Sequence, residues 1–351
     1  MELPIHGQGV LIFDSCIDFY VYNSDETDGL HVQNCVDHTH VTRLSTGELF
    51  VDEKNTKGSH WFSIDAQNQK LYGGVGEARI ETAVYVHKAD KAFLDTLTSV
   101  SPAPIRIIKD PITSRIPLVV KAKCTMHDMA RNKYMPRANL SHAAQKLYDC
   151  VENAKLNDDV FPDFGKAIEH SIATPGCWCH ETLKSKATEF GPSNPDETYL
   201  RITLGKNNGE SPGVPYVMEI WPPGHYSPIH NHGGANAIIN VLRGSINVSL
   251  FAHLGSEHPF AASNFSKGQV TWISPTLNQT HQLRNTGTKT CVTLQCYMYD
   301  SSDRVHYEYF DYLDESGTVK KFEPDSDMDF VNFRNIIMRE WNMVSWSKKL
   351  F

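Results

Sequence analysis

The sequence predicts a mainly β protein, in which a barrel or jelly roll follows a helical segment and a separate β-rich domain precedes both. Short segments rich in aromatic and β-branched residues, separated by Gly, Asn and Asp, fill residues 1–135 and return from about 199 to 312. Between them, apolar residues recur at helical spacing. We therefore expect a β-rich accessory domain of unknown role over 1–135, and a barrel domain with a helical N-terminal part over 136–351.

Composition and charge argue against several classes of protein. The formal net charge is −8 with no basic run, which argues against binding to nucleic acid. No stretch approaches the roughly 18 apolar residues of a spanning helix, so we expect no membrane segment. The start of the chain does not resemble a secretion signal, and the eight cysteines form no disulfide framework. We expect a cytoplasmic protein with reduced thiols. The sequence does not indicate the oligomeric state.

The N-terminal stretch offers strands and turns but no convincing site. Strands are predicted at Val10–Phe13, Trp61–Ile64 and Thr82–Val86. The glycines of Gly73–Gly76 predict a hairpin turn rather than a phosphate loop, because no helix clearly follows them. His38 and His40 could face the same side of a strand, but no third ligand follows in a matching context, so surface histidines are favoured.

A helical period begins after Pro136, which disfavours helix on its N-terminal side. One face of a helix is predicted, with Asn139 or Ser141 as its N-cap, by the spacing of Leu140, Ala144, Leu147, Val151 and Ala154. Two shorter helices are expected at Asp163–Ile172 and Trp178–Phe190, and a last helix at Phe330–Met343. The barrel strands alternate best in Ala237–Phe251 and Cys291–Tyr299.

The informative constellation consists of His230, His232 and His281. On a strand, residues i and i+2 point to the same side, so the first two imidazoles can aim at one point inside a barrel. The third comes from a distant strand. Three nitrogens at about 2.0–2.2 Å suit a divalent cation and leave positions open for a substrate. The alternative is that this His-x-His pair is structural or exposed. We interpret His225, His253 and His258 as surface or loop histidines.

The spacing around these histidines resembles the two motifs of the cupin superfamily. A glycine stands six residues before His230 and another twelve after His232, and Pro275 and Asn285 flank His281. Many cupins carry a glutamate shortly after the second histidine, but Gly233–Ala237 contains no carboxylate. Three neutral ligands would keep the full charge of the cation, which favours an anionic ligand such as a thiolate.

Within that superfamily the chain resembles cysteine dioxygenase and related thiol dioxygenases over about 139–312. The similarity rests on the motif Trp221–His232, on the Tyr-x-Arg of Tyr199 and Arg201, and on the spacing of Tyr297 from His281. The resemblance implies iron(II) held by the three histidines. It also implies cysteine bound through thiolate and amine, and dioxygen as the second substrate. Both oxygen atoms would end on sulfur, giving cysteine sulfinate.

The same resemblance implies roles for four further side chains. Arg201 would clamp the substrate carboxylate, because two parallel N–H donors match two oxygens. Tyr297 would place its phenol beside the oxygen site, and Tyr199 would line the pocket. Gln295 stands where the family carries a histidine, so it can hydrogen-bond but cannot titrate near neutral pH. The cysteine that animal members link to the tyrosine is replaced by Ala237.

Several alternatives stay open at the level of sequence. Arg201 could be a surface salt-bridge partner, and Tyr297 a tyrosine of the barrel core. The substrate could be another thiol carboxylate such as 3-mercaptopropionate, whereas Arg201 argues against cysteamine, which has no carboxylate. The same histidines would also serve a cupin lyase or a non-enzymatic metal-binding cupin, and zinc would fit them as well as iron.

Overall fold

The computed structural model describes residues 60–65, 67–88, 116–204, 216–299 and 309–347, and the backbone of three strands between residues 9 and 34. The chain forms two compact units. The smaller contains residues 1–115, 251–260 and 317–319, and the larger contains the remainder. Residues 116–135 therefore group with the larger unit. The division into an accessory domain and a barrel domain at residue 135 stays a prediction.

The smaller unit contains two antiparallel sheets of three strands each, in chain order. The first consists of β1 (Gly9–Phe13), β2 (Ile17–Tyr22) and β3 (Gly29–Asn34). The second consists of β4 (His60–Asp65), β5 (Lys70–Val75) and β6 (Ala83–Lys88), with the short 3-10 helix η1 (Ile80–Thr82) before β6. The predicted strands near residues 10, 61 and 83 are thus present.

The hairpin turn predicted at Gly73–Gly76 is wrong. Gly73 and Gly74 lie inside β5, where the pairing with β6 is irregular. A Cβ atom at Gly74 would collide with the indole of Trp61 and with the carbonyl oxygen of Thr82. Glycine is needed at this position because the indole and the carbonyl oxygen approach the backbone of the strand closely.

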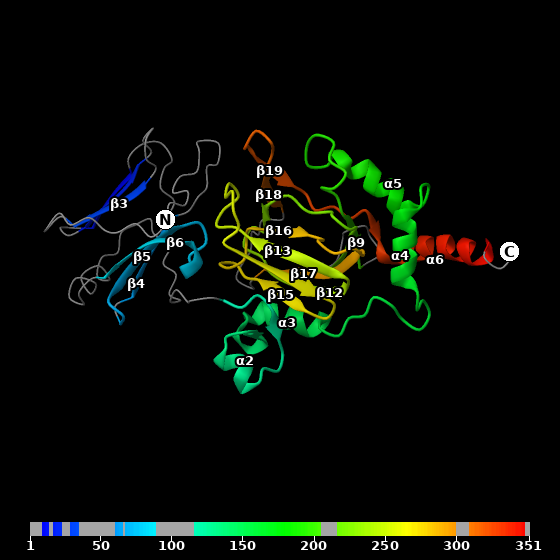
Figure 1. Ribbon diagram of the computed structural model, residues 1–351, viewed down its shortest axis with the longest axis horizontal. Coiled ribbons are helices and arrows are strands. Elements are labelled where there is room, and N and C mark those ends of the chain that lie inside the picture. The colour runs from blue at the N-terminus through cyan, green and yellow to red at the C-terminus, as the bar shows by residue number, and fades with distance from the viewer. Residues whose placement is uncertain are drawn as a thin grey trace. The chain divides into compact units, whose positions relative to one another are not determined.

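The larger unit is built from two β-sheets, part of which Figure 1 shows as β12, β15 and β17 side by side. The first sheet has the order β20-β9-β10-β17-β12-β15-β7-β8, and the second the order β14-β13-β16-β11-β18-β19. The strands of the first sheet are β7 (Val120–Lys121), β8 (Met135–Pro136), β9 (Leu200–Thr203), β10 (Tyr216–Trp221), β12 (Asn236–Arg243), β15 (Val270–Ile273), β17 (Cys291–Met298) and β20 (Met328–Asp329). Those of the second are β11 (His230–Asn231), β13 (Ser245–Leu250), β14 (Ala261–Ser266), β16 (His281–Arg284), β18 (Phe310–Leu313) and β19 (Val319–Phe322).

Helices cover one face of the first sheet. They are α3 (His142–Val151), α4 (Phe164–Ala173), α5 (Trp178–Ser185) and α6 (Phe330–Ser347). The structure also contains the short helix α2 (Met126–Ala130), which has no buried residue, and the 3-10 turns η2 (Arg137–Asn139) and η3 (Lys186–Thr188). Helix α3 packs on β12 and β17, whereas α4, α5 and α6 share a core with β9 and β10. The helices predicted after residue 139 and at the C-terminus are therefore present.

Helix α3 begins as the sequence predicts. Ser141 is its N-cap, and the hydroxyl of Ser141 accepts a hydrogen bond from the backbone N–H of Ala144. The same hydroxyl donates to Oδ1 of Asn236, the first residue of β12, over 2.6 Å. The cap thus also joins the helix to the strand that it covers. None of the helices in the described part of the chain is long and apolar enough to cross a membrane.

The two faces of the first sheet differ in polarity. Leu200, Ile220 and Val292 pair across β9, β10 and β17 and contribute to the apolar core under the helices. Their chain neighbours point to the opposite face, because side chains alternate along a strand. Arg201, Glu219 and Thr293 pair there in the same way, and all are buried. The jelly roll predicted from the sequence is confirmed, and its interior carries buried polar groups.

Glycine at the turn between β12 and β13 serves a second purpose besides reversing the chain. Gly244 has a φ of +69°, and a Cβ atom there would lie 2.8 Å from the carbonyl oxygen of Thr290. Gly268 has a comparable φ of +82° but open space around it. An alanine costs about 1–2 kcal/mol at either position for the left-handed backbone.

We expect Gly244→Ala to lower the free energy of unfolding by about 1 kcal/mol more than Gly268→Ala, because only the former also overpacks. Urea denaturation of the two variants tests this expectation. Equal losses would mean that the contact with Thr290 is easily relieved.

Candidate metal centre

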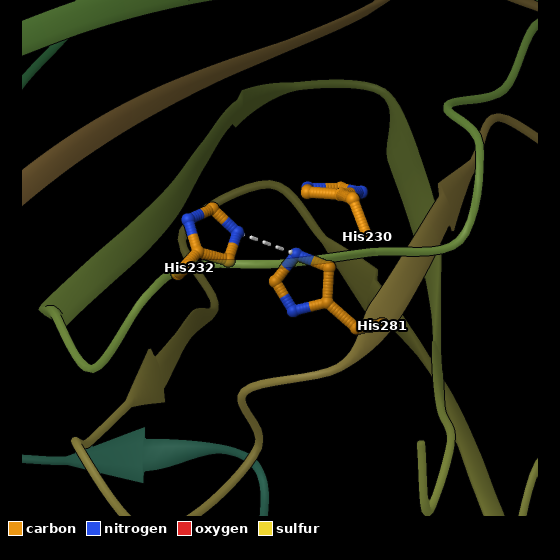
Figure 2. A group of neighbouring side chains, drawn as sticks. All are labelled: His230, His232 and His281. Carbon is orange, nitrogen blue, oxygen red and sulfur yellow. Dashed lines mark hydrogen bonds between the residues drawn. The ribbon is translucent and has the colours of Figure 1, made fainter. Parts of the chain in front are cut away.

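The three predicted histidines come from neighbouring segments of the second sheet. His230 lies in β11 and pairs directly with His281 in β16. His232 lies just outside β11, between the end of that strand and the turn at Gly233 and Gly234. Both glycines have positive φ, so the chain can turn sharply straight after the second histidine. Figure 2 shows the three rings facing one another across a small space.

The spacing of the ring nitrogens suits a shared cation. One nitrogen from each of the three rings lies within 4.8 Å of the others. The Nε2 atoms of His232 and His281 are 3.0 Å apart (Figure 2). Two nitrogens bound at right angles at about 2.1 Å from one ion would be about 3.0 Å apart. Three or more His, Cys, Asp or Glu side chains with a geometry that could hold a metal ion occur once in the described part of the chain. The group consists of these three histidines.

Hydrogen bonds to the other ring nitrogens orient two of the ligands. Nδ1 of His230 lies 3.0 Å from the carbonyl oxygen of Pro228, and Nδ1 of His281 lies 3.3 Å from that of Asn278. A carbonyl oxygen can only accept, so each Nδ1 carries the proton and each Nε2 keeps its lone pair for a metal. Nδ1 of His232 is buried, and it has no hydrogen-bond partner among the residues that the structure describes.

Burial keeps all three imidazoles neutral, which is the form that binds metals. It lowers the pKa of His230 to about 4, and it lowers the pKa of His232 and of His281 well below the usual value. The neighbouring imidazoles and Arg201 act in the same direction on His232. Protons therefore compete with a cation only in strongly acid solution.

We expect metal affinity to be almost independent of pH between pH 7 and pH 5. A histidine of ordinary pKa would be almost fully protonated at pH 5, and each such ligand would weaken binding about 30-fold. Here the pKa of His230 lies at about 4, so the imidazole stays neutral across this range. Equilibrium dialysis against zinc(II) at pH 7, 6 and 5 measures the effect. A tenfold loss of affinity by pH 6 would contradict it.

No family model matches the sequence. Among solved structures, a cupin domain of Schizosaccharomyces pombe Cnp3 is similar at 16% identity, over 29% of this chain and 66% of that chain, with a TM-score of 0.24. The cupin_2 domain of an XRE family transcriptional regulator from Enterobacter cloacae matches at 14% identity, over 29% and 97%, with a TM-score of 0.24. An oxalate oxidase in complex with the substrate analogue glycolate matches at 21%, over 30% and 52%, with a TM-score of 0.25.

The two β-sheets of the larger unit form a jelly roll. The three histidines come from neighbouring segments of its second sheet and meet inside the barrel. The chain thus combines a jelly-roll fold with a candidate three-histidine metal site.

A buried polar network lies on the interior face of the first sheet. Nη1 of Arg201 donates to Oε1 of Glu219 over 2.6 Å, and the two side chains are 4% and 3% exposed. Gln295 donates through Nε2 to the other oxygen of Glu219 and accepts through Oε1 from the hydroxyl of Tyr297. Burial raises the pKa of Glu219, whereas the adjacent guanidinium of Arg201 lowers it and favours the ionised carboxylate. The structure thus links Arg201, Gln295 and Tyr297, which the sequence singled out separately, through one carboxylate.

Aromatic rings connect this network to the histidines. The ring of Tyr297 stacks on His232 with centroids 5.3 Å apart, and burial raises the pKa of its hydroxyl well above the usual value. Phe310 lies 4.3 Å from the ring of His232, and the guanidinium carbon of Arg201 lies 5.8 Å from the ring of Phe310. Arg201 and Tyr297 therefore stand in the same interior as the candidate metal ligands.

The remaining residues that the sequence singled out lie around this interior, in loops, or outside the described part of the chain. The ring of Tyr199 stacks on Trp221 at 4.2 Å and on Phe190 at 6.4 Å. Ala237 pairs directly with Tyr297 across β12 and β17, so no sulfur stands opposite the phenol. His225 is half-buried beside Thr198, His258 is exposed, and His253, which we expected at the surface or in a loop, lies in a loop but is buried. His38 and His40 lie outside the described residues.

Sequence reasoning missed Glu219 and Phe310. Glu219 had a signal, because it is the charged residue in the otherwise apolar run Val217–Trp221, which the structure shows as part of β10. A carboxylate at such a position must find a buried partner. Phe310 had none, since it follows the barrel motifs and its proximity to His232 depends on how β18 pairs with β11.

Proposed function

We propose that this chain is an iron(II)-dependent thiol dioxygenase that converts cysteine to cysteine sulfinate. The observation that carries the proposal is the donor set: three neutral, buried imidazoles without a carboxylate among them, facing Tyr297 and Phe310. Such a site leaves the charge of a divalent cation uncompensated, and a thiolate is the ligand that neutralises it. Iron(II) supplies the coordination positions at which a thiolate and dioxygen react, so that RS⁻ and O2 become RSO2⁻.

The side chains of this protein contribute position and exclusion of water. His230, His232 and His281 would hold the cation, with two rings oriented by backbone carbonyls. The hydroxyl of Tyr297 is fixed by Gln295 at one side of the pocket, and burial keeps it protonated as a hydrogen-bond donor. The ring of Phe310 lies against His232 and beside Tyr297, and this apolar group would limit side reactions with water.

A small thiol and dioxygen are the proposed partners, in a reducing compartment such as the cytoplasm. In the described part of the chain, the cysteines at 124, 150, 177, 179, 291 and 296 are free. Free cysteines fit a compartment in which thiols are kept reduced. A substrate thiol would be kept in its reduced form there as well.

Oxygen consumption tests the function. The full chain, purified without metal and loaded anaerobically with iron(II), should consume one O2 per cysteine and produce the sulfinate, measured by an oxygen electrode and mass spectrometry. His258→Ala, which alters an exposed histidine of a loop, is the matched control. Loss of cysteine without oxygen consumption would indicate a lyase. The zinc-loaded protein should be inactive. Metal binding without turnover of any thiol would overturn the proposal.

A further inference from the structure

Arg201, which the family resemblance assigns to a substrate carboxylate, already has a carboxylate partner within the protein. Glu219 stands directly opposite Arg201 in the pairing of β9 with β10, and the two side chains meet on the interior face of the sheet. Both oxygens of Glu219 are used, one by Arg201 and one by Gln295. The glutamate is therefore held in place from two strands and cannot swing aside without losing both hydrogen bonds.

The pair changes what the guanidinium attracts. One positive charge is already offset by a negative charge at 2.6 Å, in an interior where charges are poorly screened. A second carboxylate beside Arg201 would approach Glu219, and two carboxylates that share a buried site repel each other strongly. The position next to Arg201 therefore disfavours a free carboxylate, whereas a neutral group meets no such repulsion.

One donor of the guanidinium has no partner among the described residues. Nε of Arg201 is buried and forms no hydrogen bond with any of them. A buried N–H without a partner is costly, so a ligand that offers an acceptor oxygen there gains affinity. The oxygen of an amide or ester can satisfy this donor without adding a second negative charge beside Glu219.

We propose that Glu219 determines specificity, and that it makes the pocket select aminothiols in which the carboxylate is absent or is present as a neutral carbonyl group. This inference rests on the proposed function, because it names the substrate class of the same site. Cysteine then binds through its thiolate and amine, and its carboxylate contributes little or nothing. A thiol carboxylate that lacks the amine, such as 3-mercaptopropionate, is the poorest ligand of the series.

A panel of thiols tests the inference on the unaltered protein. We expect kcat/KM for L-cysteinamide and cysteamine to equal or exceed that for L-cysteine, and to exceed that for 3-mercaptopropionate by at least about tenfold. Anaerobic calorimetric titration of the same thiols into the iron-loaded chain gives affinities that do not depend on turnover. A preference for cysteine over cysteinamide by about tenfold would overturn the inference.

Glu219→Gln separates the charge from the shape. The amide can still accept from Arg201, and a rotated Gln295 amide can keep the link to Tyr297. With the charge of Glu219 gone, the ratio of kcat/KM for cysteine to that for cysteinamide should rise by at least about tenfold. An unchanged ratio would mean that Glu219 only supports the fold. If no thiol of the panel binds or consumes oxygen, the proposed function itself fails, and the inference fails with it.

Discussion

Replacing His232 by alanine should abolish stoichiometric metal binding and with it all turnover. The side chain is 2% exposed, and its Nε2 lies 3.0 Å from that of His281, so no neighbouring group can take its place at the cation. Losing a residue that merely supports a metal ligand costs about 10–100-fold in affinity. We therefore expect the loss of a ligand itself to exceed 100-fold. Metal content after dialysis, measured by mass spectrometry, together with oxygen consumption, tests this.

The matched control is again His258→Ala, which should retain the full metal content and activity. His225→Gln extends the comparison, because His225 is partly buried near the first motif but contacts Thr198 rather than the cluster. If His232→Ala still bound one metal ion per chain with undiminished affinity, the three histidines would not form the site. Circular dichroism of each variant distinguishes loss of the ligand from loss of the fold.

Replacing Glu219 by alanine should destabilise the protein by about 3–5 kcal/mol, the range found when one partner of a buried ion pair is removed. The side chain of Arg201 is only 4% exposed, so its positive charge would then be buried without the carboxylate that balances it. Gln295 would lose one of its two acceptors at the same time, and only the longer hydrogen bond to Thr293 would remain. The free energy of unfolding from urea denaturation, measured on the metal-free chain, gives the change without a contribution from metal binding.

A double variant shows whether the cost arises from the unpaired charge. Arg201→Leu combined with Glu219→Leu removes both charges and fills part of the space with apolar groups. Its stability should lie well above that of Glu219→Ala, since replacing a buried pair by apolar residues is often neutral. A loss below about 1 kcal/mol for Glu219→Ala would mean that water or another side chain replaces the glutamate.

The fold of the larger unit was largely predictable from local patterns. The helical spacing from Leu140 to Ala154 and the hydroxyl of Ser141 were sufficient to place α3. Both signals relate residues that are only three or four positions apart in the sequence. The turn at Gly73–Gly76 was mispredicted for the opposite reason. What requires glycine at Gly74 is the indole of Trp61 on the neighbouring strand, a contact that local sequence does not show.

The candidate site divides in the same way. The spacing of His230 and His232, with the flanking glycines, predicted two ligands on one side of a strand, and the structure brings His281 to them through direct strand pairing. The partner of Arg201 could not be predicted, because it depends on the register between β9 and β10, which places Glu219 opposite rather than one residue away. A shift of one residue would have turned that carboxylate toward the helices.

The two faces of the first sheet carry different kinds of side chains. The side under the helices, which includes Leu200, Ile220 and Val292, maintains the packed core. The interior side, which includes Arg201 and Glu219, carries the buried polar network beside the candidate metal ligands. A change of an inward side chain, such as Gln295 or Ala237, therefore leaves the residues that anchor the helices untouched. The chemistry of the interior can be altered without altering the packing on which the fold depends.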